Sequence, residues 1–245
     1  MPKKVKKILH ICIIVTIIIA IAFTALIFIL RYIENGETNM PFEISKITII
    51  STIDAQDVED TENRWNVKVC QNNDIYIDIK KNEEYTKNRI IKSVTVDNFK
   101  IERQPTSGNI KIYKPSTNEV KTFENIEEHE INSITYDGDK KADLQNLKIA
   151  NQGGRFAFRC ANNDVGTYVS NEEDELNYNE LLQKIGVSDS DLMCTISFDV
   201  EILLTNGTAF KTNVEIQIPA EGVSVDGKAS REITDLDIIF KRAEK

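Results

Sequence analysis

Cysteine and histidine are the side chains that could support nucleophilic catalysis, and both are scarce in this chain. Beyond residue 31 the sequence holds one histidine, His129, and three cysteines, Cys70, Cys160 and Cys194. A cysteine nucleophile reacts as a thiolate, which needs an adjacent base. The cysteines are far apart and form no CxxC pair, so neither a zinc ribbon nor a thioredoxin-like site is indicated. We therefore assign no catalytic residue from the sequence.

Carboxylates are the second group of candidate functional residues. Asp137, Asp139 and Asp143 lie close together, and residues 172–175 (EEDE) and 188–191 (SDSD) are also acidic. Oxygen ligands of this kind suit Ca²⁺. None of these stretches has the D-x-D-x-D-G spacing with a glutamate at the twelfth position. Asp137, Asp139 and Asp143 are therefore weak calcium candidates, and no other metal or cofactor is expected.

An apolar segment near the N-terminus must position everything that follows. Residues 8–30, ILHICIIVTIIIAIAFTALIFIL, carry no formal charge, and a helix needs roughly 20 apolar residues to cross a bilayer. Four lysines precede the segment, whereas only Arg31 follows it closely. Positive residues concentrate on the cytoplasmic side. We therefore expect residues 1–7 to be a cytoplasmic tail, residues 8–30 to contact the lipid bilayer, and the C-terminal domain to lie outside the plasma membrane.

A cleaved signal peptide is the alternative interpretation of this segment. Ala20-Ile21-Ala22 has the small-x-small pattern of a cleavage site. Residues 23–30 are still mostly apolar, however, whereas a mature chain normally turns polar after cleavage. The pattern therefore favours an uncleaved anchor.

The charge of the chain beyond the anchor limits its partners. Five of the 30 basic residues precede position 32, so 25 remain against 39 acidic residues, a net charge of −14. Nucleic-acid binding needs basic patches, and adhesion to anionic lipid needs a basic surface. The composition argues against both. Many isoleucines, asparagines and lysines indicate an AT-rich, bacterial genome.

Alternating apolar and polar residues predict β-strands over most of the chain from Phe42 onward. Residues 65–69 and 75–79 are expected to form a hairpin around a turn at Asn72-Asn73, and the acidic run 54–62 is expected to be a loop. A bulge is expected at Asp97-Asn98, where the alternation changes phase. The other predicted strands contain residues 47–49, 94–96, 99–101, 110–112, 156–160 and 236–240, with weaker ones near 120–123, 131–136 and 144–149.

Residues 194–218 give the sharpest local prediction. The apolar residues on both sides of Asn206-Gly207 are even-numbered. Directly opposed residues of an antiparallel pair share a face. A two-residue loop would oppose even with odd positions, whereas a three-residue loop, 205–207, pairs Ile202 with Phe210. We therefore expect the longer loop, with Gly207 in the left-handed conformation.

Strand alternation also predicts where the cysteines lie. It places Cys160 and Cys194 on apolar faces and Cys70 on a polar face. Free, buried thiols are the expectation for the first two, and any disulfide is expected between them.

The one helical pattern outside the anchor is residues 171–185, with an apolar stripe at helical spacing and a stop at Gly186.

The predicted fold is mainly β: an N-terminal transmembrane helix, a linker at residues 31–41, and an antiparallel β-sandwich at residues 42–245. The sandwich is jelly-roll or immunoglobulin-like, with one short helix and one or two subdomains. The predicted function is a non-catalytic, single-pass membrane-anchored binding or assembly module. Its expected partner is another envelope protein or a cell-wall polymer, and no nucleic acid.

The alternative function is an anchored enzyme that acts on envelope polymers. One form is a sortase-like cysteine transpeptidase, because sortases also join an N-terminal anchor to a β-barrel and use Cys, His and Arg. Their nucleophile follows TLxTC, with an arginine roughly ten residues later. Here Cys194 follows SDLM and the next arginine is Arg231, so the resemblance does not extend to the motif. The other form is a hydrolase with two carboxylates.

Overall fold

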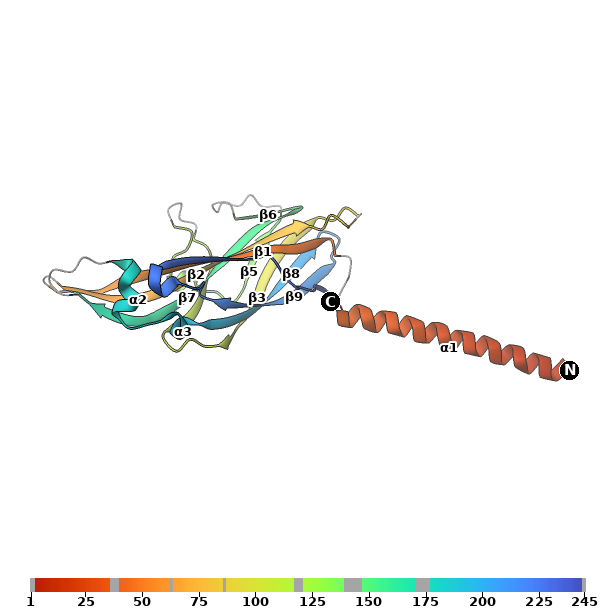
Figure 1. Ribbon diagram of the computed structural model, residues 1–245. Coiled ribbons are helices and arrows are strands. Elements are labelled where there is room, and N and C mark those ends of the chain that lie inside the picture. Colours follow the sequence, from red (N-terminus) through yellow and green to blue (C-terminus); the bar gives the residue numbers. More distant parts are fainter. Residues whose placement is uncertain are drawn as a thin grey trace.

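A computed structural model describes residues 3–35, 40–61, 64–85, 87–116, 121–138, 147–170 and 177–243 of the chain. The first element is a single long helix, α1 (Lys3–Asn35), which stands apart from a β-rich domain (Figure 1). Its window Cys12–Ile29 is long and apolar enough to cross a membrane. Both threonines in that window donate to carbonyl oxygens one turn earlier, Thr16 to Cys12 at 2.9 Å and Thr24 to Ala20 at 2.8 Å.

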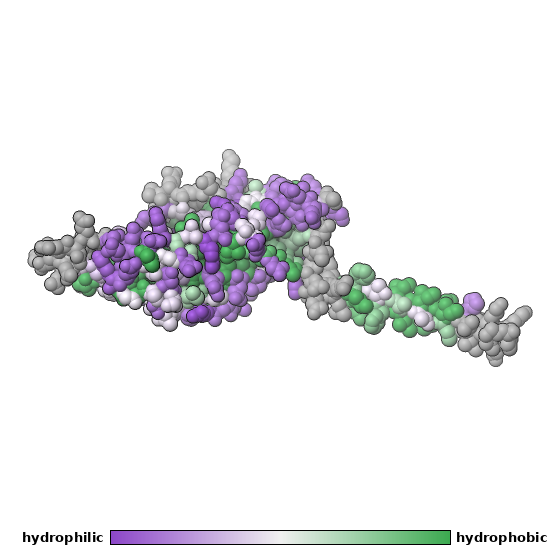
Figure 2. Space-filling model, viewed as in Figure 1, coloured by the Kyte–Doolittle hydropathy of each residue, from purple (hydrophilic) through white to green (hydrophobic). Residues whose placement is uncertain are grey.

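The helix is longer than the predicted segment 8–30. It includes residues 31–35, which we expected in the linker, because hydrogen bonding can continue past the apolar stretch into a polar turn without a Gly or Pro to stop it. Figure 2 shows the apolar side chains of α1 beside a domain surface that is largely hydrophilic in the same view.

The domain consists of two antiparallel sheets. Sheet A has the strand order β10-β1-β2-β7-β4, with β6 also paired to β7, and sheet B has the order β11-β9-β8-β3-β5. The strands are β1 (Phe42–Thr61), β2 (Arg64–Lys81), β3 (Ile91–Arg103), β4 (Asn109–Tyr113), β5 (Ile134–Asp137), β6 (Lys148–Ala150), β7 (Gly153–Val169), β8 (Cys194–Leu204), β9 (Ala209–Ile218), β10 (Lys228–Ile233) and β11 (Lys241–Arg242). The mainly β, antiparallel prediction is therefore confirmed.

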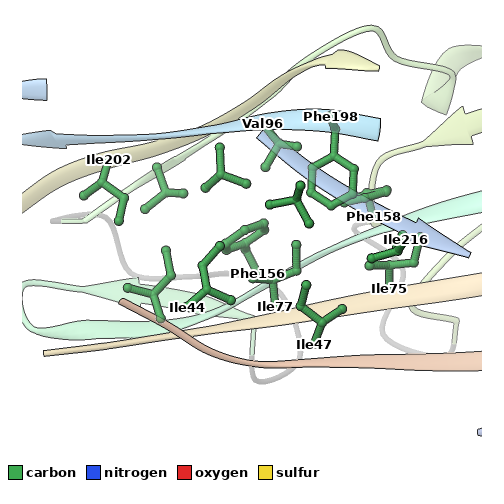
Figure 3. Close-up of a cluster of buried hydrophobic side chains, with 14 of the residues drawn as sticks. Ile44, Ile47, Ile75, Ile77, Val96, Phe156, Phe158, Phe198, Ile202 and Ile216 are labelled. Atoms are coloured by element: carbon green, nitrogen blue, oxygen red, sulfur yellow. The ribbon is translucent and has the colours of Figure 1, made fainter. Parts of the chain in front are cut away.

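One hydrophobic cluster joins the two sheets. Both sheets contribute fully buried aromatic residues to it, among them Phe156 and Phe158 from β7 and Phe198 from β8 (Figure 3). The rings of Phe158 and Phe198 meet edge to face with centroids 5.0 Å apart. Because apolar side chains of each sheet alternate toward the other sheet, their burial stabilises a sandwich arrangement.

The β8–β9 hairpin has the predicted register. Ile202 pairs with Phe210, and Ile196 pairs with Ile216. Gly207 has φ 81, in the left-handed region, and its amide donates to Leu204 O at 2.9 Å. The bulge predicted at Asp97-Asn98 is also present, as a register shift between Asp97 and Lys100 of β3.

The predicted hairpin at residues 65–79 is wrong. The chain runs straight through Asn72-Asn73 as the single strand β2, between β1 and β7. Odd-numbered side chains face inward along its whole length, from Val67 to Ile79. A two-residue turn at 72–73 would oppose odd with even positions and separate the apolar faces of its two arms. The hydrophobic pattern therefore requires one long strand.

The predicted loop at residues 54–62 is also wrong as far as the structure describes it, to Thr61. These residues continue β1 and pair with the start of β2, for example Asp54 with Cys70 and Gln56 with Lys68. Ile53 is buried and Ala55 half-buried, whereas Asp54 and Gln56 are exposed. The polar residues Asp54 and Gln56 thus alternate with inward-facing ones, as in any half-buried strand.

Sheet A is longer than sheet B, and short helices cover the remainder of its inner face. These are α2 (Leu181–Lys184), α3 (Asp189–Leu192) and α4 (Val223–Asp226), with the 3₁₀ turn η2 (Tyr178–Glu180) before α2. They bury Leu181, Leu182, Leu192 and Val223 against Ile53, Val67, Val69 and Val165 of sheet A. We call this the helix-covered half and the part enclosed by both sheets the two-sheet half.

The predicted single helix at 171–185 is therefore wrong in extent and in number. Residues 171–176 lie outside the described residues, and the helical part begins at Asn177, whose side chain caps Asn179 N. The break at Gly186 (φ 73) agrees with the predicted stop.

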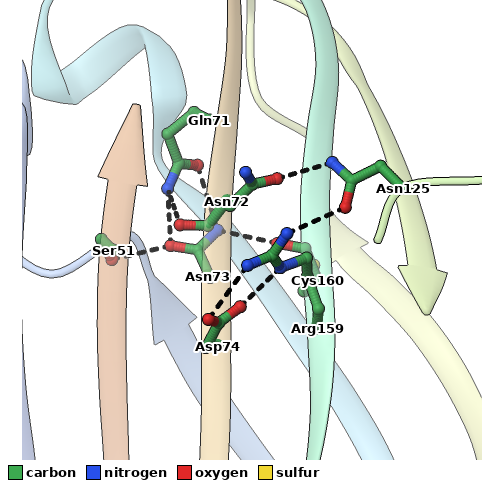
Figure 4. Close-up of polar contacts among 8 residues, drawn as sticks. All are labelled: Ser51, Gln71, Asn72, Asn73, Asp74, Asn125, Arg159 and Cys160. Carbon is green, nitrogen blue, oxygen red and sulfur yellow. Dashed lines mark hydrogen bonds and ion pairs between the residues drawn. The ribbon is translucent and has the colours of Figure 1, made fainter. Parts of the chain in front are cut away.

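A belt of buried polar side chains lies on sheet A where the two halves meet (Figure 4). Ser51 Oγ bonds Asn73 Oδ1 at 2.8 Å, and Gln71 and Asn73 exchange amide hydrogen bonds of 2.8 and 3.0 Å. Ser51 Oγ also accepts from Ala220 N at 2.8 Å, just where β9 ends. The belt therefore satisfies a backbone group that sheet B no longer pairs.

The outer face of sheet A carries paired charges. Arg159 bonds Asp74 through two contacts of 2.5 and 3.0 Å, and Arg155 bonds Asp78 through contacts of 2.7 and 2.9 Å. Arg159 also lies over the ring of Phe123, 5.0 Å from its centroid. The outward-facing side chains Asp74 and Asp78 of β2 are thus held in place by arginines of β7.

The predicted last strand, 236–240, is only partly confirmed. Leu236 and Ile238 pack against the shared core and Phe240 is buried, as the alternation indicates. Ladder pairing, however, is limited to β11, Lys241–Arg242, against β9.

Of the weak strands, 131–136 and 144–149 correspond to β5 and β6, and 120–123 is represented among described residues by a bridge between Phe123 and Pro115. The 3₁₀ turn η1 (Glu127–His129) lies between them.

Candidate functional site

One hollow lies at the seam between the two sheets, and we call it the seam hollow. Its volume is about 380 Å³. Its lining comes from the end of β9, from the α3 region and from β10: Asp189, Ser190, Met193, Gln217, Ile218, Pro219, Ala220, Glu221 and Arg231. It therefore combines an apolar floor with a few polar groups, which is the usual make-up of a small-ligand site.

Arg231 is the cation of the seam hollow. It lies opposite Ile49 in the β10–β1 pair, on the inward-facing parity that it shares with Ala229 and Ile233. Among the described residues its guanidinium makes one hydrogen bond, from Nη2 to Gln217 O, while its buried Nε has no partner. A guanidinium offers five N–H donors in a planar fork. Arg231 therefore retains the capacity to bind a carboxylate or phosphate.

The carboxylate of Asp189, in contrast, is already used by the fold. Asp189 accepts from Gly222 N at 2.7 Å and from Ser224 N at 2.9 Å, at the start of α4. Partial burial acts to raise its pKa, but the hydrogen bonds from Ser224 and Gly222 outweigh burial and lower the pKa below its usual value. Asp189 thus braces α4 and does not neutralise Arg231.

A second hollow, of about 250 Å³, lies on the outer face of sheet A. Asp164 borders it at a bulge with φ 55, and its carboxylate is 3.3 Å from Lys68. Lys111, also on its rim, is 2.7 Å from Glu130. Because these charges are already paired, the second hollow has less capacity for a charged ligand than the seam hollow.

The structure does not bring His129 and Cys194 together. Cys194 begins β8 in the shared core and is fully buried, and burial raises its pKa to about 11. His129 ends η1, outside the sandwich, where its carbonyl accepts from Lys114 N at 2.9 Å. A thiol held neutral in an apolar core is a poor nucleophile, so this geometry gives no support to a sortase-like mechanism.

The cysteines are all free, and the three in the domain lie on the faces that strand parity predicts. Cys160 and Cys194 are buried in the core shared by the sheets, as predicted, without a disulfide. Burial, and next the neighbouring Cys194 thiol, raise the pKa of Cys160. Cys70 was predicted on a polar face, yet it is only 3 % exposed because the bulge at Asp164 covers the outer face of β2 there.

The calcium candidates gain no geometric support. Asp137 ends β5, while Asp139, Asp143 and the run 172–175 lie outside the described residues. Asp191 is occupied as half of the capping box of α3, with Ser188 N 2.9 Å away. Within the described ranges, no cluster of three or more His, Cys, Asp or Glu side chains could hold a metal ion.

Sequence reasoning missed Arg231 and Gln217. The strand that carries Arg231 was not predicted, because residues 228–233 contain only two well-separated apolar positions and three charged residues. A signal was nevertheless present: Arg231 occupies the position between Ala229 and Ile233 in the inward alternation. A charged residue on an apolar parity indicates a polar partner or a ligand.

Comparison of the chain with family models, with curated proteins and with solved structures finds no match.

Proposed function

We propose that this chain is a single-pass membrane protein that holds a β-sandwich outside the plasma membrane and acts by binding. Residues 1–7 would lie in the cytoplasm, since the lysines that precede the apolar window favour that side. Exposed apolar side chains along Cys12–Ile29 support insertion. The jelly-roll or immunoglobulin-like connection of the strands remains part of this proposal.

The observation that carries the binding role is the guanidinium of Arg231 above an apolar floor, because its buried Nε has no partner among the described residues. Leaving a buried donor without a partner is costly, and an anionic group would supply that partner. The ligand we propose is a carboxylate-bearing segment of another envelope protein or of a cell-wall polymer, with an apolar portion resting on Ile218 and Pro219. Bidentate pairing of guanidinium with carboxylate would fix its orientation.

Affinity capture of the intact protein from mild detergent tests the binding role. We would compare the natural chain with Arg231→Gln and with the control Lys228→Gln, which removes an exposed charge from the same strand. A partner that is retained by the natural chain and the control but lost with Arg231→Gln supports the seam hollow as its site. Equal recovery with all three chains contradicts it.

Reporter fusions test the anchoring role separately. Alkaline phosphatase fused to the C-terminus is expected to be active in cells, because that enzyme folds only outside the cytoplasm. An inactive, full-length fusion would place the domain in the cytoplasm and refute the orientation.

A further inference from the structure

Five segments from distant parts of the chain meet at the end of the domain nearest to α1, and we call this end the base. It comprises residues 40–43, 80–92, 148–152, 204–209 and 241–243. Backbone hydrogen bonds link them in series: Asn82 N to Pro41 O at 2.9 Å, Ile91 N to Asn151 O at 3.1 Å, Thr205 N to Ile90 O at 3.0 Å and Ala243 N to Ala209 O at 3.0 Å. The C-terminus and the end of α1 lie together at this end in Figure 1.

The base has the opposite charge to the rest of the domain. It contains eight basic and three acidic residues, a net charge of +5, and the linker residues Glu34 and Glu37 reduce this to +3. The remaining residues beyond position 31 carry 17 basic and 34 acidic side chains, a net charge of −17. The overall value of −14 therefore conceals a strong segregation of charge. The eight basic residues are Lys80, Lys81, Lys87, Arg89, Lys92, Lys148, Lys241 and Arg242.

The basic side chains of the base are accessible. Seven are exposed and Arg89 is half-exposed. Among the described residues one of them forms an ion pair, Lys80 with Glu43 at 3.1 Å. A basic surface that is not neutralised by its own domain can bind anions on another surface.

The length of the connection keeps the base near the bilayer. From Ile29 to Asn35 the helix rises about 9 Å, and the five residues from Asn35 to the buried Met40 span at most about 18 Å. Met40, the first residue of the base, therefore lies within about 27 Å of the end of the apolar window of α1. Electrostatic attraction extends only about 8 Å at physiological ionic strength, so a small tilt of the domain brings these charges into range of headgroups.

We infer that the base is a docking surface for anionic phospholipid headgroups of the same membrane that α1 spans. This inference rests on the proposed anchoring. It differs from the expectation drawn from net charge, which argued against lipid adhesion, because it considers the charge of the surface that faces the bilayer. Docking would hold the acidic remainder of the domain, including the seam hollow, away from the membrane.

Fluorescence quenching on the full chain in nanodiscs tests this inference. A fluorophore is attached at Asn88→Cys in the base, or at Val225→Cys in α4 as the far-end control, in a Cys12→Ser background; the other thiols are buried. The nanodiscs contain headgroup-linked quencher in phosphatidylcholine alone or with one part in three of phosphatidylglycerol. We expect quenching at position 88 to rise with phosphatidylglycerol and to fall in about 0.5 M salt, and quenching at position 225 to stay low.

Charge reversal provides the matched comparison. The combined variant Lys87→Glu, Lys92→Glu and Lys241→Glu is expected to abolish the lipid-dependent quenching. Each substitution should lower the equilibrium constant for docking about fivefold. Lys100→Glu, Lys121→Glu and Lys228→Glu change the net charge equally on exposed positions outside the base and are expected to leave it unchanged. Measured unfolding midpoints for both variants would check that each is folded.

The outcomes separate this inference from the proposed anchoring. A chain that does not enter nanodiscs refutes the anchoring itself. A chain that inserts but shows no phosphatidylglycerol-dependent quenching at position 88, or loses it equally with both triple variants, overturns the docking surface alone. The triple variant of the base is also compared with the natural chain for capture of an anionic wall polymer. If the variant loses that capture while its quenching is unchanged, lipid is refuted as the partner of the base.

Discussion

The two-sheet half and the helix-covered half share sheet A but bury it in different ways. In the two-sheet half, strand faces strand, and β3, β8 and β9 supply regularly alternating side chains. In the helix-covered half, three helices of four residues each supply four buried apolar side chains from irregular positions. The first arrangement is continuous and repetitive, whereas the second depends on a few separate contacts.

One long sheet can therefore carry a cooperative core over one half and a core with fewer, more separate contacts over the other. Short helices gain little stability from their own hydrogen bonds and depend on packing. Regions with fewer buried contacts open at lower free energy than the global unfolding. We therefore expect the helix-covered half to be the less stable part, and the predictions below compare the halves.

The largest expected effect is Phe198→Ala in the two-sheet half. Phe198 is fully buried, and its ring centroid lies 5.0 Å from that of Phe158 and 5.9 Å from that of Phe99. Removing such a ring should lower the free energy of unfolding by about 3–5 kcal/mol. Denaturant titration of the full chain in detergent measures this. A loss below about 1 kcal/mol would mean that the shared core is loosely packed.

Leu182→Ala should have a smaller global effect, near the lower end of the range of about 2–5 kcal/mol for buried leucines. Leu182 is 1 % exposed, and we expect short helices to relax around a cavity more readily than paired strands. Limited proteolysis is expected to cleave residues 177–192 faster in this variant and to leave 194–218 intact. Equal acceleration in both ranges would contradict the difference between the halves.

Ser51→Ala probes the boundary between the halves. The change leaves Ala220 N without its 2.8 Å acceptor and removes one partner of Asn73. An unsatisfied buried donor typically costs about 1–3 kcal/mol. The control Ser45→Ala removes a half-buried hydroxyl with one 3.2 Å contact to Asp78 O and should cost less. Equal midpoints for these two variants would show that the polar belt does not join the halves.

The smallest expected effect is the pH dependence from Asp189. Its pKa is lower in the folded state than the usual 3.8, so its contribution to stability is present at neutral pH. That contribution should be lost as the pH falls below the ordinary carboxyl range and Asp189 becomes protonated. The stability of Asp189→Asn should change less with pH across this interval. Parallel pH profiles for both chains would contradict a role for Asp189 in bracing α4.

The same contrast explains what the sequence could predict. In β8 and β9, even-numbered apolar residues continue across Asn206-Gly207, and the parity argument yields the register. The parity of residues 65–79 is equally unbroken across Asn72-Asn73. There, Asn72 and Asn73 favour a turn by residue type, whereas parity excludes a two-residue turn at 72–73 for the same reason that it excludes a two-residue loop at 206–207.

The helix-covered half could not be predicted in the same way because its contacts are between elements, not within them. The polar residues Gln71 and Asn73 face inward because sheet B ends opposite them, and nothing local to β2 specifies that. Arg231 reaches the seam hollow for the same reason. Strand parity can show that a side chain faces inward, whereas the identity of its partner depends on the packing of distant segments.

Hydrogen exchange of the intact chain, followed by mass spectrometry at peptide level, tests the division of the domain most directly. The account predicts that amides of β3, β8 and β9 exchange only with global unfolding, in nanodiscs and in detergent alike. It predicts that residues 178–192 and 223–226 exchange faster, through local opening of α2, α3 and α4. Uniform protection across both halves, or faster exchange in β8 than in α2, would contradict it.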